Sequence, residues 1–329
     1  MSVLSPLWYT PMGGSPVADG SSHLPPWSLE YHGSRSRVAP LELARAVSLQ
    51  GSDASHRNMS SEKGPVLTRS LSSNREGEEL PAAALDVLAK TDLKSAKIKL
   101  YEFNESPPCW KVRALLHFYG LEYESVIAFP GAKVEGIDNT YHKIPKLVID
   151  DVQINDSAVI FRTLAPLLTG KPLSTEEVEL EQRNNIRGLL GALEKETVSS
   201  YWGIANATRV VTSTWSSWAF APVKPVLPYL AGLIAPVPML IFSRGAMPHG
   251  KDGPSITHGH AFRAALGTRA FFHGEEIGPL DLSLYGSLAC FLWLEAPAAA
   301  AVLDRCDLRR WYERCDAKVK AVRALNARV

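Results

Sequence analysis

Hydrophobic positions between residues 97 and 170 first alternate and then recur with a helical period, which predicts a compact unit of strands and helices. Residues 97–103 alternate as a buried strand, and apolar side chains at i, i+3, i+4 and i+7 predict a helix that ends at Gly120. Further strands are expected at 122–128, 143–149 and 152–154, and a second helix is expected from 157 to Gly170. The resulting order is a βαβ–ββα unit of the α+β class.

After residue 170 the pattern becomes helical, which predicts an all-α part over residues 171–329. Ser174 and Glu177 form a capping-box sequence, so we expect a helix that begins there and continues through Leu193. Further helices are expected at 214–220, at 278–295 and from about residue 307. Asp281 falls at the third position of the helix over 278–295, where its carboxylate can bond back to the cap. We interpret Asp281 as a folding element.

Residues 1–95 differ from the rest of the chain in composition. Sixteen of the first 80 residues are serine, glycine and proline are scattered throughout, and no apolar period persists. Such a segment cannot bury enough surface to offset its ordering entropy, so we expect a disordered extension. Five arginines among the first 70 residues favour an organelle transit peptide, mitochondrial before plastid. Acidic residues interrupt that pattern, so a plain tail on a cytoplasmic protein stays an alternative.

Charge and cysteine usage exclude several classes of function. The net charge is +1 and no basic block is present, so binding to nucleic acid is not expected. The four cysteines, at positions 109, 290, 306 and 315, have neither a Cys-x-x-Cys spacing nor the pattern of a secreted disulfide framework. A reducing compartment fits best.

Residues 225–242 form an uncharged stretch that four prolines interrupt. Its length is marginal for crossing a bilayer, and each proline leaves backbone groups that lipid cannot satisfy. A buried or interfacial helix, a contact with a membrane surface or a membrane-protein partner, and a span all stay open. His249, His258 and His260 follow in a Gly- and Pro-rich segment, which we expect to be a surface loop without a metal.

A turn of sequence Ser106-Pro107-Pro108-Cys109 joins the first strand to the first helix. A strand-to-helix turn directs backbone N–H groups and the positive end of the helix dipole at its surroundings, which lowers a thiol pKa and attracts anions. Cys109 therefore has two interpretations. In the first, the helix dipole stabilises a reactive Cys109 thiolate. In the second, the side chain faces inward and packs as a small apolar residue.

The start of the second helix carries Asn155-Asp156-Ser157. A carboxylate and a hydroxyl at this place can receive the ammonium and carboxylate groups of an amino-acid-like ligand. The alternative is that both side chains only cap their helix.

Residues 97–170 resemble the thioredoxin-fold half of the glutathione transferases and glutaredoxins. The resemblance rests on the turn that begins at Ser106, on Lys143-Ile144-Pro145, and on Asn155-Asp156-Ser157. Within that superfamily the chain is most similar to the type 2 membrane-associated prostaglandin E synthases, which convert prostaglandin H to prostaglandin E. The runs that match these synthases are 110–114, 141–145, 155–160 and 280–286. The resemblance is good over 97–170, patchy over 171–329 and absent from 1–95.

The resemblance implies a thioredoxin-like domain at 96–170 and an all-helical transferase C-terminal-like domain at 171–329, after the extension 1–95. Family members bind glutathione at the turn, here Pro108, and through the backbone before a cis-proline, here Ile144 and Pro145. Their acid–serine pair, here Asp156 and Ser157, holds the γ-glutamyl end. The resemblance further implies an apolar second ligand and membrane association. It is the only ground for expecting haem. An oligomer is compatible with it.

One residue departs from the family pattern. The reactive cysteine of the family is Ser106 here, and a hydroxyl cannot form the mixed disulfide that dithiol exchange requires. A serine can still donate a hydrogen bond to a glutathione thiolate. The sequence therefore supports two hypotheses: a glutathione-dependent transferase or isomerase that uses Ser106 or Cys109, and an inactive scaffold or accessory subunit of an organellar membrane complex.

Overall fold

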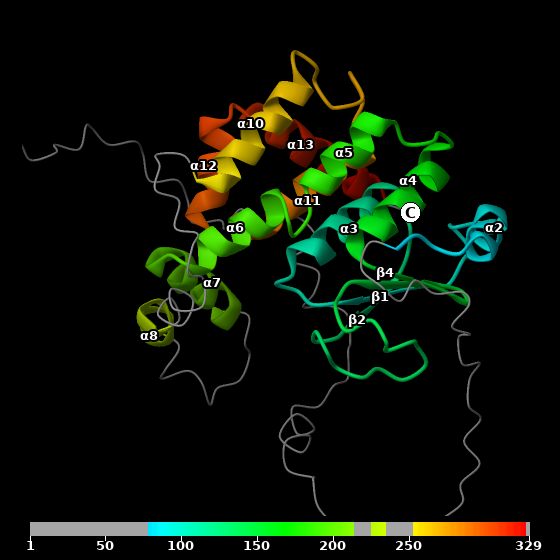
Figure 1. The fold of residues 1–329 in the computed structure, drawn as a ribbon, viewed down its shortest axis with the longest axis horizontal. Coiled ribbons are helices and arrows are strands. Elements are labelled where there is room, and N and C mark those ends of the chain that lie inside the picture. Colours follow the sequence, from blue (N-terminus) through cyan, green and yellow to red (C-terminus); the bar gives the residue numbers. More distant parts are fainter. Residues whose placement is uncertain (1–77, 214–224, 235–252, 327–329) are drawn as a thin grey trace, which may run out of the picture.

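The computed structural model describes residues 78–213, 225–234 and 253–326. A four-stranded sheet with its own helices occupies one side of the molecule, and a group of helices occupies the other (Figure 1). This arrangement confirms the expected α+β fold class, with helices throughout the described residues after 170. The expected helix at 214–220 lies outside the described residues.

The sheet has the strand order β2-β1-β3-β4. Its strands are β1 (Ile98–Glu102), β2 (Glu124–Ile127), β3 (Lys146–Ile149) and β4 (Val152–Asn155). Strand β1 runs parallel to β2 and antiparallel to β3, and β3 runs antiparallel to β4. The βαβ–ββα order expected from the hydrophobic pattern is therefore confirmed.

Helices α3 (Pro107–Phe118) and α4 (Ser157–Thr169) cover the same face of this sheet (Figure 1). Leu100 of β1 and Leu147 of β3 lie opposite each other in register, and both are buried with Leu116 of α3. Helix α4 ends at Gly170, which has a φ of 68°, the left-handed conformation that glycine adopts most readily at a helix end.

Part of the expected disordered extension is structured. Residues Ala82–Lys90 form helix α2, and its side chains Ala84 and Leu88 join the core of the sheet unit together with Leu80. These three apolar residues are spaced four apart, which places them on one face of a helix. Because this apolar pattern is short and its neighbours are polar, the helix was not predicted from the sequence. Residues 1–77, including the proposed targeting signal, lie outside the described residues.

Eight helices are described after residue 170: α5 (Thr175–Arg183), α6 (Leu189–Val198), α7 (Tyr201–Ser213), α8 (Leu227–Ile234), α10 (Pro254–Leu266), α11 (Pro279–Trp293), α12 (Pro297–Arg305) and α13 (Arg309–Asn326). The prediction of one helix from Ser174 through Leu193 was wrong, because the chain turns between α5 and α6. Gly188 permits this turn: a side chain there would place its Cβ 2.0 Å from the carbonyl oxygen of Arg183.

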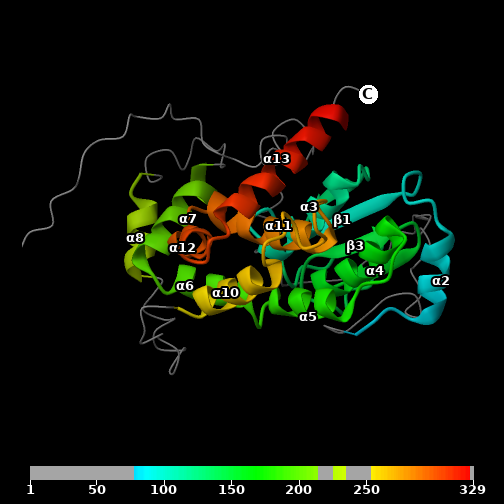
Figure 2. The ribbon, with the colours of Figure 1, turned by 90° about the horizontal axis from the view of Figure 1, so that it is seen from above.

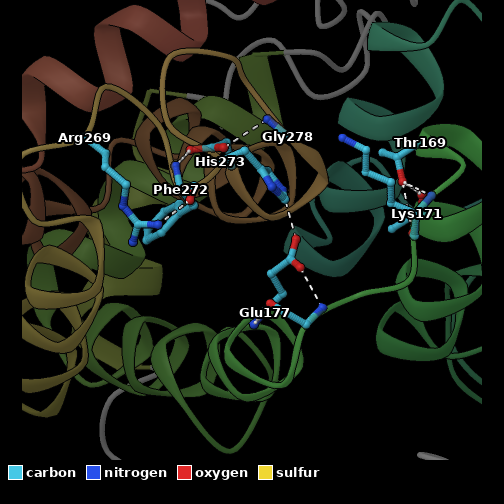
Figure 3. A network of polar contacts seen from close by, with 10 residues as sticks. Thr169, Lys171, Glu177, Arg269, Phe272, His273 and Gly278 are labelled. Carbon is cyan, nitrogen blue, oxygen red and sulfur yellow. Dashed lines mark hydrogen bonds and ion pairs between the residues drawn. The ribbon is translucent and has the colours of Figure 1, made fainter.

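Helix α11 lies in the middle of the molecule, beside α3 (Figure 2). The two helices approach closely at Gly286, where a Cβ would lie 2.6 Å from the carbonyl oxygen of Trp110. Buried Asp281 fixes the start of α11. Its Oδ2 accepts a hydrogen bond from the Gly278 N–H at 3.0 Å, and its Oδ1 accepts from the Phe272 N–H at 3.0 Å (Figure 3). The indole of Trp311 also donates to Oδ1, at 2.8 Å.

A fully buried ion pair joins the sheet unit to the helical part. Lys111 of α3 contacts Glu181 of α5, and neither side chain is exposed to solvent. The hydroxyl of Ser283, in α11, donates to Glu181 at 2.6 Å, and the Asn184 amide donates to that hydroxyl at 3.1 Å. The pair thus connects three helices at the place where both parts of the molecule meet.

The histidine-rich segment was predicted to be a loop, and this prediction was wrong for its described part. His258 and His260 lie in α10, which begins with Pro254 at its first position. His249 lies outside the described residues. Among the residues that the structure covers, no group of three or more His, Cys, Asp or Glu side chains could hold a metal ion. No helix within those ranges is long and apolar enough to cross a membrane.

Replacing Lys111 by methionine should destabilise the protein by about 3–5 kcal/mol, because it leaves the Glu181 carboxylate buried and unpaired. The double variant Lys111→Met/Glu181→Gln should recover part of this loss, since it removes the charge and keeps an acceptor for Ser283. Urea unfolding measures both. The matched control is Lys99→Met, which breaks an exposed pair with Glu124 and should change the free energy of unfolding by less than about 1 kcal/mol. Equal losses for Lys111→Met and Lys99→Met would contradict this account.

Candidate functional site

A cavity of about 760 Å³ lies between the sheet unit and the helical part. Four of the residues proposed from the sequence line it: Pro108, Ile144, Asp156 and Ser157. Other lining residues come from α5, from the turn between α5 and α6, and from α10. The cavity therefore combines groups that are far apart in the sequence.

Strand pairing explains why Ile144 and Asp156 reach the same place. The Ile144–Pro145 peptide bond is cis, as expected, and strand β3 begins immediately after it. Lys146, the first residue of β3, pairs with Asn155, the last residue of β4. The residues just outside this pair are therefore neighbours at one end of the sheet. Pro145 itself is not among the cavity-lining residues.

Asp156 is the N-cap of α4, and its side chain keeps an unused oxygen. The Oδ1 atom accepts a hydrogen bond from the Ala158 N–H at 2.8 Å. The backbone φ of Asp156 is 73°, which lies outside the helical region. Among the described residues no donor to Oδ2 is found. One carboxylate can therefore cap the helix and also receive a ligand ammonium group. The two interpretations of Asp156 are compatible with each other.

Ser106 and Cys109 do not line the cavity. Ser106 is the N-cap of α3, but its half-buried hydroxyl does not bond to the helix backbone. Cys109 is completely buried. Burial, followed by the nearby Glu102 carboxylate, raises the pKa of the Cys109 thiol to about 12, although hydrogen bonds from Ser106 and the Phe103 backbone oppose the rise. The thiol is therefore protonated at neutral pH, which argues against a reactive Cys109 thiolate.

A second buried ion pair fixes the loop that leads into the turn. Arg113 of α3 donates from Nε to Glu102 of β1 at 2.5 Å and from Nη1 to Asn104 Oδ1 at 2.9 Å. The indole of Trp110 donates to the Asn104 carbonyl oxygen at 2.6 Å. Asn104, two residues before Ser106, is thus held from two positions of α3, at its backbone carbonyl by Trp110 and at its side chain by Arg113, which sets where the turn presents its serine.

Sequence reasoning missed the positive charges of the cavity. Four cationic side chains line it: Lys143, Arg162, Arg183 and Arg187. The carboxylates among the lining residues are Glu79 and Asp156, and Glu79 accepts a hydrogen bond from Arg162 at 2.6 Å. Lys143 belongs to the Lys143-Ile144-Pro145 motif that the sequence analysis identified. The three arginines are brought together only by the fold. Even so, the two arginines four residues apart at 183 and 187 were visible in the sequence.

Comparison with known proteins agrees with this geometry. The family model described as "Glutathione S-transferase, N-terminal domain" matches residues 100–172. Residues 100–172 are thus similar to the N-terminal domain of glutathione S-transferases. The match begins within β1 and extends just past the end of α4, so it includes the turn, the cis-proline and the Asp156–Ser157 pair.

Two curated relatives carry the name prostaglandin E synthase 2. The zebrafish (Danio rerio) protein is 35% identical over 114 residues, which is 33% of this chain and 28% of that protein. The mouse (Mus musculus) protein is 39% identical over 89 residues, which is 26% of this chain and 23% of that protein. The match thus spans less than a third of either relative.

Solved glutathione transferases show a looser likeness. A glutathione S-transferase III in its apo form is 21% identical to this chain. The alignment covers 69% of this chain and 96% of that structure. The TM-score is 0.41. The similarity to transferases is carried by the domain match and by the curated relatives.

The native protein should show no thiol that reacts rapidly with Ellman's reagent at neutral pH, because all four cysteines are buried. Four thiols should react after unfolding in guanidinium. Ser106→Cys is the positive control, since it places a thiol at the start of α3 and should add one fast-reacting group. A fast-reacting native thiol that Cys109→Ala removes would contradict the buried, protonated Cys109.

Proposed function

We propose that the protein binds glutathione in this cavity. In the proposed complex the Ile144 backbone pairs with the cysteinyl residue, Asp156 receives the γ-glutamyl ammonium group, and Ser157 binds the adjacent carboxylate. The observation that carries the proposal is that Ile144, Asp156 and Ser157 line one cavity, and all three lie in the part of the chain that matches the transferase N-terminal domain model. The cationic lining supports it, because glutathione carries two carboxylates and one ammonium group.

We propose that Ser106 donates a hydrogen bond to the glutathione thiolate. Its hydroxyl does not itself line the cavity, but it is half-buried at the N-terminus of α3, two residues before the cavity-lining Pro108, where the helix dipole favours negative charge. An apolar second substrate would complete a glutathione-dependent transferase or isomerase, of the kind that the prostaglandin E synthase 2 relatives suggest. Such a reaction uses the thiol of glutathione and needs none from the protein. We do not extend the proposal to haem, which only the resemblance implied.

The second candidate function is a scaffold without catalytic activity, for example an accessory subunit of an organellar membrane complex. One observation favours it: neither Ser106 nor Cys109 supplies a thiolate, since the pKa of Cys109 is raised to about 12 by burial. Glutathione binding separates the two candidates, because a scaffold does not require the Asp156–Ser157 pair to hold a ligand.

Asp156→Asn should weaken glutathione binding about tenfold or more, because it removes the charge that faces the ligand ammonium group. Asparagine caps helices as well as aspartate does, so the melting temperature should stay nearly unchanged. Isothermal titration calorimetry on the full chain measures the affinity. The full chain is required because α2 contributes to the core.

Asp138→Asn is a matched control for this experiment. Asp138 accepts hydrogen bonds from Thr140 and does not line the cavity, so its replacement should leave the affinity for glutathione unchanged. Absence of glutathione binding to the wild-type chain at millimolar concentration would refute the enzyme and favour the scaffold.

We propose two domains, at 96–170 and 171–329, with α2 packed on the first.

We also propose that residues 225–242 contact a membrane surface, in keeping with an organellar, membrane-associated location. Support comes from α8 and the residue before it: Val226, Tyr229 and Leu230 follow at i, i+3 and i+4, and each is about half exposed, at 53%, 54% and 47%.

Vesicle cosedimentation tests the proposed membrane contact. The full chain should sediment with phosphatidylcholine–cardiolipin vesicles, and Tyr229→Ser/Leu230→Ser should reduce the bound fraction severalfold, because it removes apolar side chains that insert at the interface. Val87→Ser, which changes an exposed apolar residue of α2, is the control and should bind as the wild type does. Equal binding of all three proteins would exclude α8 as the contact.

A further inference from the structure

A carboxylate from the segment before α2 reaches into the cavity. Glu79 precedes α2 in the chain, and it lines the cavity together with Arg162 of α4. The Nε of Arg162 donates a hydrogen bond to Glu79 Oε1 at 2.6 Å, although 83 positions separate the two residues in the sequence. The chain before the first strand thus supplies a charged group to a cavity whose other lining residues all come from after that strand.

The position of Glu79 is set by its neighbours in the chain. Leu80 is buried in the core of the sheet unit, and Pro81 is the N-cap of α2. Helix α2 packs against β4 at the outer edge of that unit (Figure 1). When the contact between Glu79 and Arg162 breaks, the carboxylate therefore stays beside the cavity, at a high effective concentration.

The two partners of this ion pair differ in their access to water. The Glu79 side chain is 62% exposed, whereas that of Arg162 is 15% exposed. A pair with one exposed partner contributes little to stability, so it can open at small cost. The released carboxylate is then hydrated, but the guanidinium stays largely buried and needs another anion in place of Glu79.

Arg162 lies close to the junction of the sheet unit with the helical part. Burial raises the pKa of the Glu181 carboxyl, and the charges of Lys111 and, more weakly, of Arg162 oppose that rise. Within the described residues, Glu79 is the carboxylate that forms an ion pair with Arg162. Arg162 therefore already has the kind of partner that an anionic ligand in the cavity would supply.

We propose that Glu79 is an intramolecular competitor of anionic ligands, because its carboxylate occupies Arg162 until a ligand anion displaces it. This inference rests on the proposed function, since it concerns the regulation of the same cavity. Glutathione is such a ligand, because it brings two carboxylates. A competitor that belongs to the protein lowers the apparent affinity by the fraction of molecules in which Arg162 is available.

The test compares the wild type with Glu79→Gln, both as the full chain. The amide keeps the size of the side chain and removes the charge that holds Arg162. Nuclear magnetic resonance of the arginine Nε–H groups follows titrations with two probes, reduced glutathione and inorganic phosphate. Asp86→Asn is the matched control, since it removes one negative charge from an exposed side chain of α2 that does not line the cavity.

Glu79→Gln should bind both probes about threefold or more tightly than the wild type, and Asp86→Asn should bind them as the wild type does. Misfolding cannot produce such a gain. In a protein that already carries Arg162→Gln, the change Glu79→Gln should give no gain, because the contact that it breaks is absent.

Three results would overturn the inference. They are a phosphate affinity that Glu79→Gln does not raise, no detectable binding of phosphate to Glu79→Gln, and an equal gain with and without Arg162. The last result would show that Glu79 acts through the overall charge of the cavity and does not occupy Arg162.

The glutathione titration separates this inference from the proposed function. Glutathione bound equally well by the wild type and by Glu79→Gln would overturn the inference and leave the proposed function standing. A wild type that binds no glutathione, together with a phosphate affinity that Glu79→Gln raises in the presence of Arg162 alone, would refute the proposed function and support the inference.

Discussion

The buried contact between Lys111 and Glu181 determines where the two parts of this protein meet. It joins α3 to α5, and the Ser283 hydroxyl extends it to α11. A buried charge is tolerated only when its partner is held in place, so the pair fixes the relative position of these helices. The cavity depends on that position, because its walls come from the sheet unit on one side and from α5, α6 and α10 on the other. Close packing of α11 on α3 at Gly286 stabilises the same junction, and the Asp281 network fixes the start of α11 within the helical part.

Ligand binding and nucleophilic chemistry are separable in this fold. The groups proposed to hold glutathione sit at the ends of β3 and β4 and at the start of α4, and all are present. The start of α3, where the resembled transferases and glutaredoxins have a reactive cysteine, carries the hydroxyl of Ser106. The remaining cysteine of the turn faces the core, and burial raises the pKa of its thiol to about 12. A site of this kind can activate a thiol that the ligand brings, whereas it offers none of its own.

The elements of the sheet unit could be predicted from the sequence because each has a strong local signal. Short apolar strand segments, a glycine at the end of α4 and a capping residue at its start are all local features, and the structure has strands and a helix at these places, although β3 and β4 are buried at every residue and do not alternate. The errors arose where a local pattern was continuous but the chain turned, as between α5 and α6 at Gly188, or where an apolar pattern was short, as in α2. The cationic lining of the cavity could not be predicted, because Arg162 and Arg183 are brought together only by the packing of α4 against α5. The buried partners of Glu181 could not be predicted for the same reason.

The central claim is that one cavity between the sheet unit and the helical part binds glutathione. A crystal structure of the full chain grown with saturating glutathione tests this most directly. The account predicts the γ-glutamyl group at Asp156 and Ser157, the cysteinyl backbone paired with Ile144, and the sulfur directed towards Ser106. An empty cavity under those conditions, or glutathione bound elsewhere on the molecule, would contradict it.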